Sequence, residues 1–345
     1  MNNLIIILLV ALSFGLLVVG HEFGHFILAK INGVKVEEFA IGMGLLVFKV
    51  KGKETMYSLR LLPIGGYVKM LGEYDDSEEN ISQEDKERSY IFKHPLRKIS
   101  IILAGPVMNF ILAFIIFAGL SVATGYNSSI ISNVADGSPA QVAGLQVGDE
   151  IIRLNSKKFL NWNDFVFKLQ NLKDKGNVNI TVLRDGKKLD FNIKPEISGN
   201  SLVIGINSKF VTDVGFFESI VNGFKSMLFE IKQVINSLIM LLTGQVSFKD
   251  LGGPVTIFKI SGEAAKNGFS NLMNFTAFLS VNLGIFNLIP FPALDGGAII
   301  VNLIELITRK KINQNILAKI NYVGFTLLIL LMIAVTIKDI FFPIV

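Results

Sequence analysis

Residues 4–29 read LIIILLVALSFGLLVVGHEFGHFILA, an apolar run whose only ionisable side chains are those of His21, Glu22 and His25. A run of this length can cross a bilayer as a helix. Ionisable groups are costly inside a membrane and usually serve a function there. Residues four positions apart share one face of a helix, so both imidazoles can reach one metal ion with Glu22 beside them. The run therefore predicts a membrane-spanning helix that carries a metal site.

The composition agrees with a membrane protein. The chain has 345 residues, of which 51% are hydrophobic, more than one soluble core of this size would bury. Its net charge of +5 is modest, and the basic residues lie between apolar runs, so we expect no nucleic-acid partner. The chain has no cysteine and three histidines, so a metal must be held by His and by oxygen ligands. The third histidine, His94, is expected in an interfacial loop without a chemical role.

Four stretches are apolar and long enough, or nearly so, to cross the bilayer. They are Leu4–Ala29, Ile99–Gly125, Leu272–Ile289 and Ile320–Ile337. No charged side chain precedes the first run, whereas Lys30 and Lys35 follow it. The positive-inside rule therefore places the N-terminus outside the cell and residues 30–98 in the cytoplasm.

The third run is broken by two prolines and is followed by Asp295. Residues 287–297 read NLIPFPALDGG, and a regular helix cannot continue through this segment. Irregular backbone at membrane depth survives only where it is buried in protein or lines a cavity. A catalytic zinc site usually has three protein ligands, so Asp295 is predicted to join His21 and His25. The alternative is that Asp295 only caps a helix.

If Asp295 lies beside the two histidines, the direction in which the last two spans cross the membrane is determined. The third span must then run inward, which places residues 309–319 in the cytoplasm and the C-terminus outside. Residues 216–248 could form a further span or an amphipathic helix on the outer surface. An even number of crossings is needed between residues 216 and 271, and zero is the simplest, so the sequence favours the surface helix.

Residues 127–207 have the character of a soluble α+β domain. Gly137–Ile151 resembles the GSPAxxAGLxxGDxI signature of bacterial PDZ domains. Val178–Leu183 and Leu189–Ile193, joined through Asp185-Gly186, predict a β-hairpin. We expect one inserted PDZ domain, whose groove suits an extended peptide or a chain end. The expected organisation is residues 1–125 for the first two spans, 127–207 for the PDZ domain, 208–271 for an extracytoplasmic amphipathic segment and 272–345 for the last two spans.

A membrane-associated β-hairpin is predicted between the first two spans. Met56–Leu61 and Tyr67–Leu71 have the pattern of strands around the turn Pro63-Ile64-Gly65-Gly66. Its exposed edge could bind an unwound substrate by strand addition, and the alternative is an ordinary surface hairpin. For the amide of Asn287 we favour contact with a substrate carbonyl, and for that of Asn109 a hydrogen bond that joins helices.

Taken together, the HExxH motif in the first span, the single PDZ insertion and the NxxPxPxLDGG run resemble the site-2 proteases, a family of intramembrane zinc metalloproteases, in their bacterial form. The resemblance covers essentially the whole chain. It implies one zinc ion per chain, held by His21, His25 and Asp295, with Glu22 as the catalytic acid and base. Substrate contacts are expected at residues of the broken span and of the hairpin: Asn287, Pro290, Pro292, Gly65, Gly66 and Tyr67. Some members of the family carry two PDZ domains, whereas one is recognisable here.

The sequence thus predicts a polytopic α-helical protein of the bacterial inner membrane, with both termini and the PDZ domain outside the cytoplasm. By resemblance, its activity is endoproteolysis within the transmembrane segments of single-pass membrane proteins, such as anti-sigma factors or remnant signal peptides. The expected partners are these substrates, the lipid bilayer and a peptide at the PDZ domain. The alternative is a membrane PDZ scaffold with a non-catalytic metal site. Glu22 favours the enzyme, because a structural site needs ligands but no base.

Overall fold

The computed structural model describes residues 3–73, 82–172, 176–199, 201–247 and 252–343. The chain divides into two compact units, one formed by Met1–Ala113 with Gln233–Val345 and the other by Phe114–Lys232. Helix α3 (Pro95–Thr124) and helix α6 (Phe216–Leu242) are each divided between the two units.

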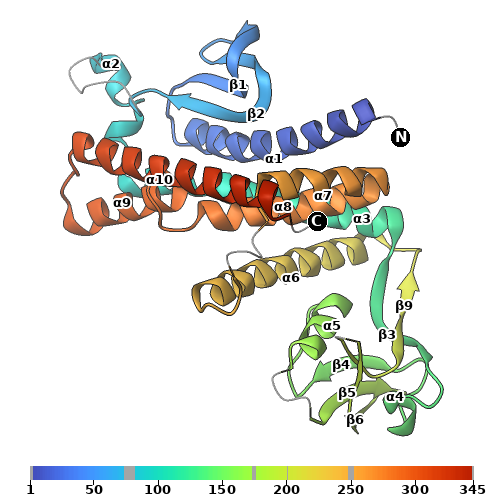
Figure 1. Cartoon of the computed structure of the whole chain (residues 1–345). Helices are drawn as coiled ribbons and strands as arrows, with labels where there is room; N and C mark the ends of the chain where they lie inside the picture. The colour runs from blue at the N-terminus through green and yellow to red at the C-terminus, as the bar shows by residue number, and fades with distance from the viewer. Residues whose placement is uncertain (1–2, 74–81, 173–175, 200, 248–251, 344–345) are drawn as a thin grey trace. The chain divides into compact units, whose positions relative to one another are not determined.

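The first unit is built on long apolar helices (Figure 1). Among the described residues, four helices are long and apolar enough to cross a membrane, in agreement with the predicted number. They are α1 (Asn3–Ile31), α3, α8 (Phe269–Asn287) and α10 (Gln314–Phe341). The shorter α7 (Pro254–Lys266) contacts α1, α8 and α10. Helix α9 (Asp295–Thr308) follows the break after α8.

Small residues let the helices around α3 approach closely. A Cβ built on Gly24 of α1 would lie 2.2 Å from the carbonyl oxygen of Ala104 in α3. On α8, the Ser280 hydroxyl donates to the carbonyl oxygen of Asn109, also in α3, at 2.8 Å. In lipid, the hydrophobic effect does not drive helices together. Close packing at small residues and hydrogen bonds between helices stabilise their association instead. Part of α3 therefore contacts both α1 and α8.

Between α1 and α3 lie two long, bent strands, β1 (Val36–Lys51) and β2 (Met56–Met70), followed by the short helices α2 (Gln83–Lys86) and η1 (Tyr90–Phe92). The prediction that Met56–Leu61 and Tyr67–Leu71 pair with each other is wrong. Ile41 of β1 pairs with Leu59 on one side and with Gly66 on the other, so the first part of β1, residues 38–41, lies between the two halves of β2. The turn signal at residues 63–66 marks a bend in one continuous strand. The missed pairing is local where Lys51 pairs with Met56, and it joins more distant residues where Phe39 pairs with Val68.

The second unit contains a five-stranded antiparallel sheet in the order β6-β5-β4-β3-β9. Its strands are β3 (Tyr126–Val134), β4 (Glu150–Leu154), β5 (Val178–Arg184), β6 (Lys187–Ile193) and β9 (Ile206–Val211), with a side hairpin of β7 (Glu196–Ser198) and β8 (Ser201–Val203). Helices α4 (Pro139–Val142) and α5 (Trp162–Gln170) accompany the sheet. Ser138 caps α4 with Pro139 at its first turn, and β5 pairs with β6, as the sequence predicted. The core contains Ile131, Phe165 and Ile180.

Helix α6 is not among the four helices that qualify as membrane spans in the described part of the chain. Within the second unit, Lys232 near its middle donates to the carboxylate of Asp164 in α5 at 2.5 Å. The rings of Phe229 and Phe167 lie 6.4 Å apart. The sequence treated residues 208–271 as one segment, whereas the structure separates α6 from α7.

Candidate metal centre

Three potential ligand atoms converge where α9 begins beside α1. His21 Nε2 and His25 Nε2 lie 3.1 Å apart. Asp295 Oδ2 lies 3.2 Å from the former and 3.6 Å from the latter. The corners of a tetrahedron around zinc would be separated by about 3.4 Å, given metal–ligand distances of about 2.1 Å. The three atoms therefore have the mutual spacing that one zinc ion requires.

The segment between α8 and α9 delivers Asp295 to this place. A Cβ on Gly296 would lie 2.2 Å from the carbonyl oxygen of Ile289, and one on Gly297 would lie 2.3 Å from that of Phe291. The glycine pair thus allows the chain between the helices to fold closely over the start of α9. Further support comes from α10, where the Asn321 side chain accepts a hydrogen bond from the backbone N–H of Ala293 at 3.3 Å.

Two further features suit a bound cation: a buried carboxylate oxygen without a hydrogen-bond partner, and a glycine where a side chain would crowd the histidines. Asp295 Oδ2 is buried and has no hydrogen-bond partner among the residues that the structure describes. A buried carboxylate oxygen in this condition is costly unless a cation or a proton compensates it. A Cβ on Gly105 would lie 2.4 Å from His25 Nε2 and 2.8 Å from His21 Cε1. These residues therefore fit a zinc ion, and the glycine keeps its place clear.

The hydrogen bond of His25 presents the correct nitrogen to a metal. Its Nδ1 lies 2.9 Å from the carbonyl oxygen of Ile101. A carbonyl can only accept, so Nδ1 carries the proton and Nε2 keeps its lone pair. Such outer hydrogen bonds fix both the tautomer and the orientation of a metal-binding imidazole.

Asn109 contacts the other histidine, His21. Its amide nitrogen lies 3.1 Å from His21 Nδ1, and its amide oxygen is buried with no partner in the described part of the chain. The two ends of an amide are assigned from the hydrogen-bond network, and a half-turn places Oδ1 against Nδ1–H. The turned amide leaves His21 Nε2 unprotonated for a metal. The predicted hydrogen bond between helices is confirmed for Asn109, since Asn109 lies on α3 and His21 on α1. The sequence did not identify His21 as the partner, because nothing local relates the two residues.

Glu22 lies against the strand β2. A Cβ on Gly66 would lie 3.3 Å from Glu22 Cγ and 2.8 Å from the carbonyl oxygen of Ala40. The half of β2 that contains Gly66 pairs with β1 on one side only among the described residues. An edge of β2 that pairs with no second strand in the described part of the chain therefore lies close to Glu22.

A polar cluster holds the two strands together near this edge. The Arg60 guanidinium donates to Glu38 Oε1 at 2.9 Å and to the Tyr67 hydroxyl at 2.5 Å. Ser58 donates to the same carboxylate oxygen at 2.5 Å. The hydroxyl of Tyr67, predicted to contact substrate, is therefore engaged within the β1–β2 pair.

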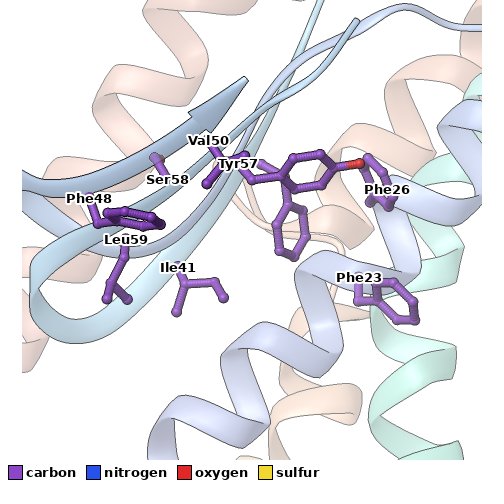
Figure 2. Close-up of a pocket in the computed structure, with 9 residues that line it drawn as sticks. Phe23, Phe26, Ile41, Phe48, Val50, Tyr57, Ser58 and Leu59 are labelled. Atoms are coloured by element: carbon purple, nitrogen blue, oxygen red, sulfur yellow. The ribbon is translucent and has the colours of Figure 1, made fainter. Parts of the chain in front are cut away.

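An apolar pocket of about 260 Å³ opens between α1 and the strands (Figure 2). Phe23 and Phe26 line it from α1, and they directly follow Glu22 and His25 in the sequence. The other walls come from β1 and β2, including Ile41, the partner of Gly66 in the ladder. Residues that line the pocket are therefore neighbours of Glu22 in the sequence, as Phe23 is, or of Gly66 in the β1–β2 pair, as Ile41 is.

The remaining predicted substrate residues are less closely tied to the centre. Asn287 ends α8, and its side chain has no hydrogen bond to another described residue. Pro290 is exposed, whereas Pro292 packs so closely that a Cβ on Gly324 of α10 would lie 2.5 Å from its Cβ. Gly65 has a φ of +90° and adjoins Met43.

Comparison with known proteins places these features in a family. The model of peptidase family M50 matches residues 9–331. The chain is 42% identical to a protein of Clostridium acetobutylicum named as a zinc metalloprotease, and 98% of each chain is covered. It is 44% identical to a protein of the same designation from Clostridium perfringens, over 98% of this chain and 99% of the relative. It is 32% identical to the regulator of sigma-W protease RasP of Bacillus subtilis, over 95% and 96%.

Proposed function

Because this chain belongs to peptidase family M50, the site-2 proteases, and is a zinc metalloprotease of the membrane, we propose that His21, His25 and Asp295 hold its zinc ion and that Glu22 is its catalytic base. The observation that carries the proposal is the convergence of the three ligand atoms within 4.8 Å of one another. The buried, unpartnered Asp295 Oδ2 and the cleared space at Gly105 support the same assignment.

The chemistry follows from the positions of these side chains. Bound zinc would act as a Lewis acid that makes water a stronger nucleophile near neutral pH. Glu22 would take a proton from the attacking water and return it to the leaving amine. His25 and His21 would keep their orientation through Ile101 and Asn109 respectively. Asn287 would donate a hydrogen bond to the carbonyl under attack, for which its unengaged side chain is available.

We propose that the substrate is the transmembrane segment of a single-pass membrane protein. A helix shields its carbonyls in intrahelical hydrogen bonds, so such a segment must unwind before a peptide bond can be attacked. The free edge of β2 at Gly66 could receive the unwound segment as an added strand next to Glu22. The pocket beside Phe23 could then accept one of its apolar side chains. Gly65, Pro290 and Pro292 would shape the path without supplying chemistry.

The topology and the role of the second unit are part of the proposal. Basic residues at 30–98 and 309–319 favour a cytoplasmic side for these segments, with both termini outside. We propose that the sheet of residues 126–211 is a PDZ domain that binds a peptide or chain end and selects substrates with short outer parts. By the family resemblance, anti-sigma factors and remnant signal peptides are the substrate classes to examine first.

The decisive experiment compares membranes that contain the intact enzyme with membranes that contain Glu22→Gln. The variant should accumulate single-pass fragments that the intact enzyme removes, while it retains about one zinc ion per chain. Lys310→Gln, a charge change in a segment remote from the HExxH motif in sequence, is the matched control and should leave the fragments unchanged. An unaltered membrane proteome in the Glu22→Gln strain would contradict the proposal.

A further inference from the structure

A cationic pocket lies where α1 ends and α3 begins. It has a volume of about 510 Å³ and is lined by Ile31 at the end of α1, by Glu87 and Arg88 before η1, by Lys93 directly after η1, and by Arg97 in the first turn of α3. All of these residues belong to the first unit. The pocket is separate from the metal centre and from the apolar pocket of Figure 2.

The positive charges of the pocket are incompletely neutralised. Arg88 forms an ion pair with Glu54, which also binds Lys30. Lys93 donates to the backbone carbonyl oxygen of Glu87 at 2.6 Å, a contact that leaves its charge unpaired. Within the described ranges, the Arg97 guanidinium makes no hydrogen bond and no ion pair.

The cations are close enough to affect one another. Burial lowers the pKa of the Lys93 ammonium, and the neighbouring charges of Arg97 and Arg88 lower it further against the opposing effect of Glu87. Like charges gathered around one hollow repel each other unless an anion lies between them. A guanidinium without a partner at such a place offers planar, bidentate binding to a phosphate group.

The position of the pocket suggests where that phosphate comes from. Helices α1 and α3 are both apolar enough to cross the membrane, so the pocket lies where two spans leave the hydrocarbon. Exposed apolar side chains accompany the cations: Ile31 is 71% exposed, and Leu96, next to Arg97 in the chain, is 56% exposed. Basic pockets at the cytoplasmic ends of transmembrane helices are suited to lipid headgroups.

We propose that this pocket binds the phosphate-bearing headgroup of an anionic phospholipid of the cytoplasmic leaflet, with Arg97 and Lys93 on the phosphate and Ile31 and Leu96 along an acyl chain. The inference rests on the membrane placement of α1 and α3 and on the cytoplasmic side proposed for residues 30–98, and it is independent of the assignment of Glu22 and the metal ligands. A bound lipid would tie together the ends of the two helices that carry His21, His25 and Asn109.

The test uses the full-length protein in detergent and counts bound lipid by native mass spectrometry during titration. Phosphatidylglycerol should bind the wild type more tightly than phosphatidylcholine does. Arg97→Gln should weaken phosphatidylglycerol binding about tenfold, since it removes charged hydrogen bonds to the phosphate. Lys93→Gln should also weaken it, and Arg97→Lys should fall between wild type and Arg97→Gln, because a lysine keeps the charge but loses the bidentate geometry.

The control is Lys310→Gln, which changes the same charge on the proposed cytoplasmic side but outside the pocket, and it should bind phosphatidylglycerol like the wild type. Because the Arg97 guanidinium makes no hydrogen bond or ion pair with another described residue, its variants should keep their zinc and their melting temperature. Inorganic phosphate at equal concentration should not displace the lipid. Equal binding by Arg97→Gln and wild type, equal binding of the two lipids, equal weakening by Lys310→Gln, or displacement by phosphate alone would each overturn the proposal.

Discussion

Gly105 on α3 directly faces His25 on α1, and a single added carbon on the glycine would lie 2.4 Å from the imidazole Nε2. That nitrogen is the one its hydrogen bond to Ile101 leaves free for a metal. The space for the proposed zinc ion is therefore bounded by the missing side chain of Gly105 as well as by the three proposed ligands.

Gly105→Ala should abolish zinc binding, since the new methyl group would occupy the region between the two imidazoles. Zinc per purified chain, measured by plasma emission spectrometry, should fall from about one to near zero. Gly119→Ala on the same helix is the matched control, because a Cβ there has nothing within 4 Å. A Gly105→Ala protein with full zinc would show that the ion lies elsewhere.

Asp295→Ala should lose both zinc and activity, because the chain has no cysteine and no further histidine near the site to replace the carboxylate. Glu22→Gln is the informative comparison, since a base that is not a ligand can be removed without loss of metal. A zinc assay should therefore distinguish the two variants, with zinc lost from Asp295→Ala and retained in Glu22→Gln. If both variants lost zinc equally, Glu22 would have to be counted among the ligands.

Asn109→Leu should lower zinc affinity by about 10–100-fold, the usual cost of removing an outer hydrogen bond to a metal-bound histidine. A competition titration with a chromogenic chelator would measure it. Ser280→Ala serves as the control, because that hydroxyl bonds to the backbone of Asn109 but not to His21. Comparable zinc affinity in Asn109→Leu and the wild type would remove Asn109 from the site.

Gly66→Ala should reduce cleavage about 10²-fold while leaving zinc in place, because the added carbon would crowd Ala40 and shift the strand edge relative to Glu22. Gly15→Ala, on α1 with nothing within 4 Å, should cleave normally. The assay is cleavage of a transmembrane reporter by purified enzyme in detergent. Normal cleavage by Gly66→Ala would argue against substrate binding at this edge.

The proposed topology predicts which introduced cysteines react from outside. The natural chain has none, so single replacements give an unambiguous signal. A membrane-impermeant maleimide should label Lys187→Cys in intact spheroplasts, and Lys310→Cys only after lysis. Labelling of the latter before lysis would reverse the orientation.

The sequence was most informative where chemistry is encoded locally. The spacing of His21 and His25 and the prolines before Asp295 can be read without a structure, because helix periodicity and backbone chemistry act over a few residues. The four apolar helices follow from length and composition alone. In contrast, the amide of Asn109 beside His21 depends on how α3 packs against α1. The position of residues 38–41 of β1 between the halves of β2 depends on pairing between distant segments.

The positions of the proposed ligands along the chain determine when during synthesis the site can be completed. The helix with His21 and His25 is synthesised among the first residues, whereas Asp295 and the segment that positions it come near the end of the chain. If Asp295 is the third ligand, as proposed, a growing chain inserts its HExxH motif into the bilayer before that ligand has been made. Proteolytic capacity would begin only when the last helices have been made, so ribosome-bound intermediates would be harmless to the newly inserted proteins around them.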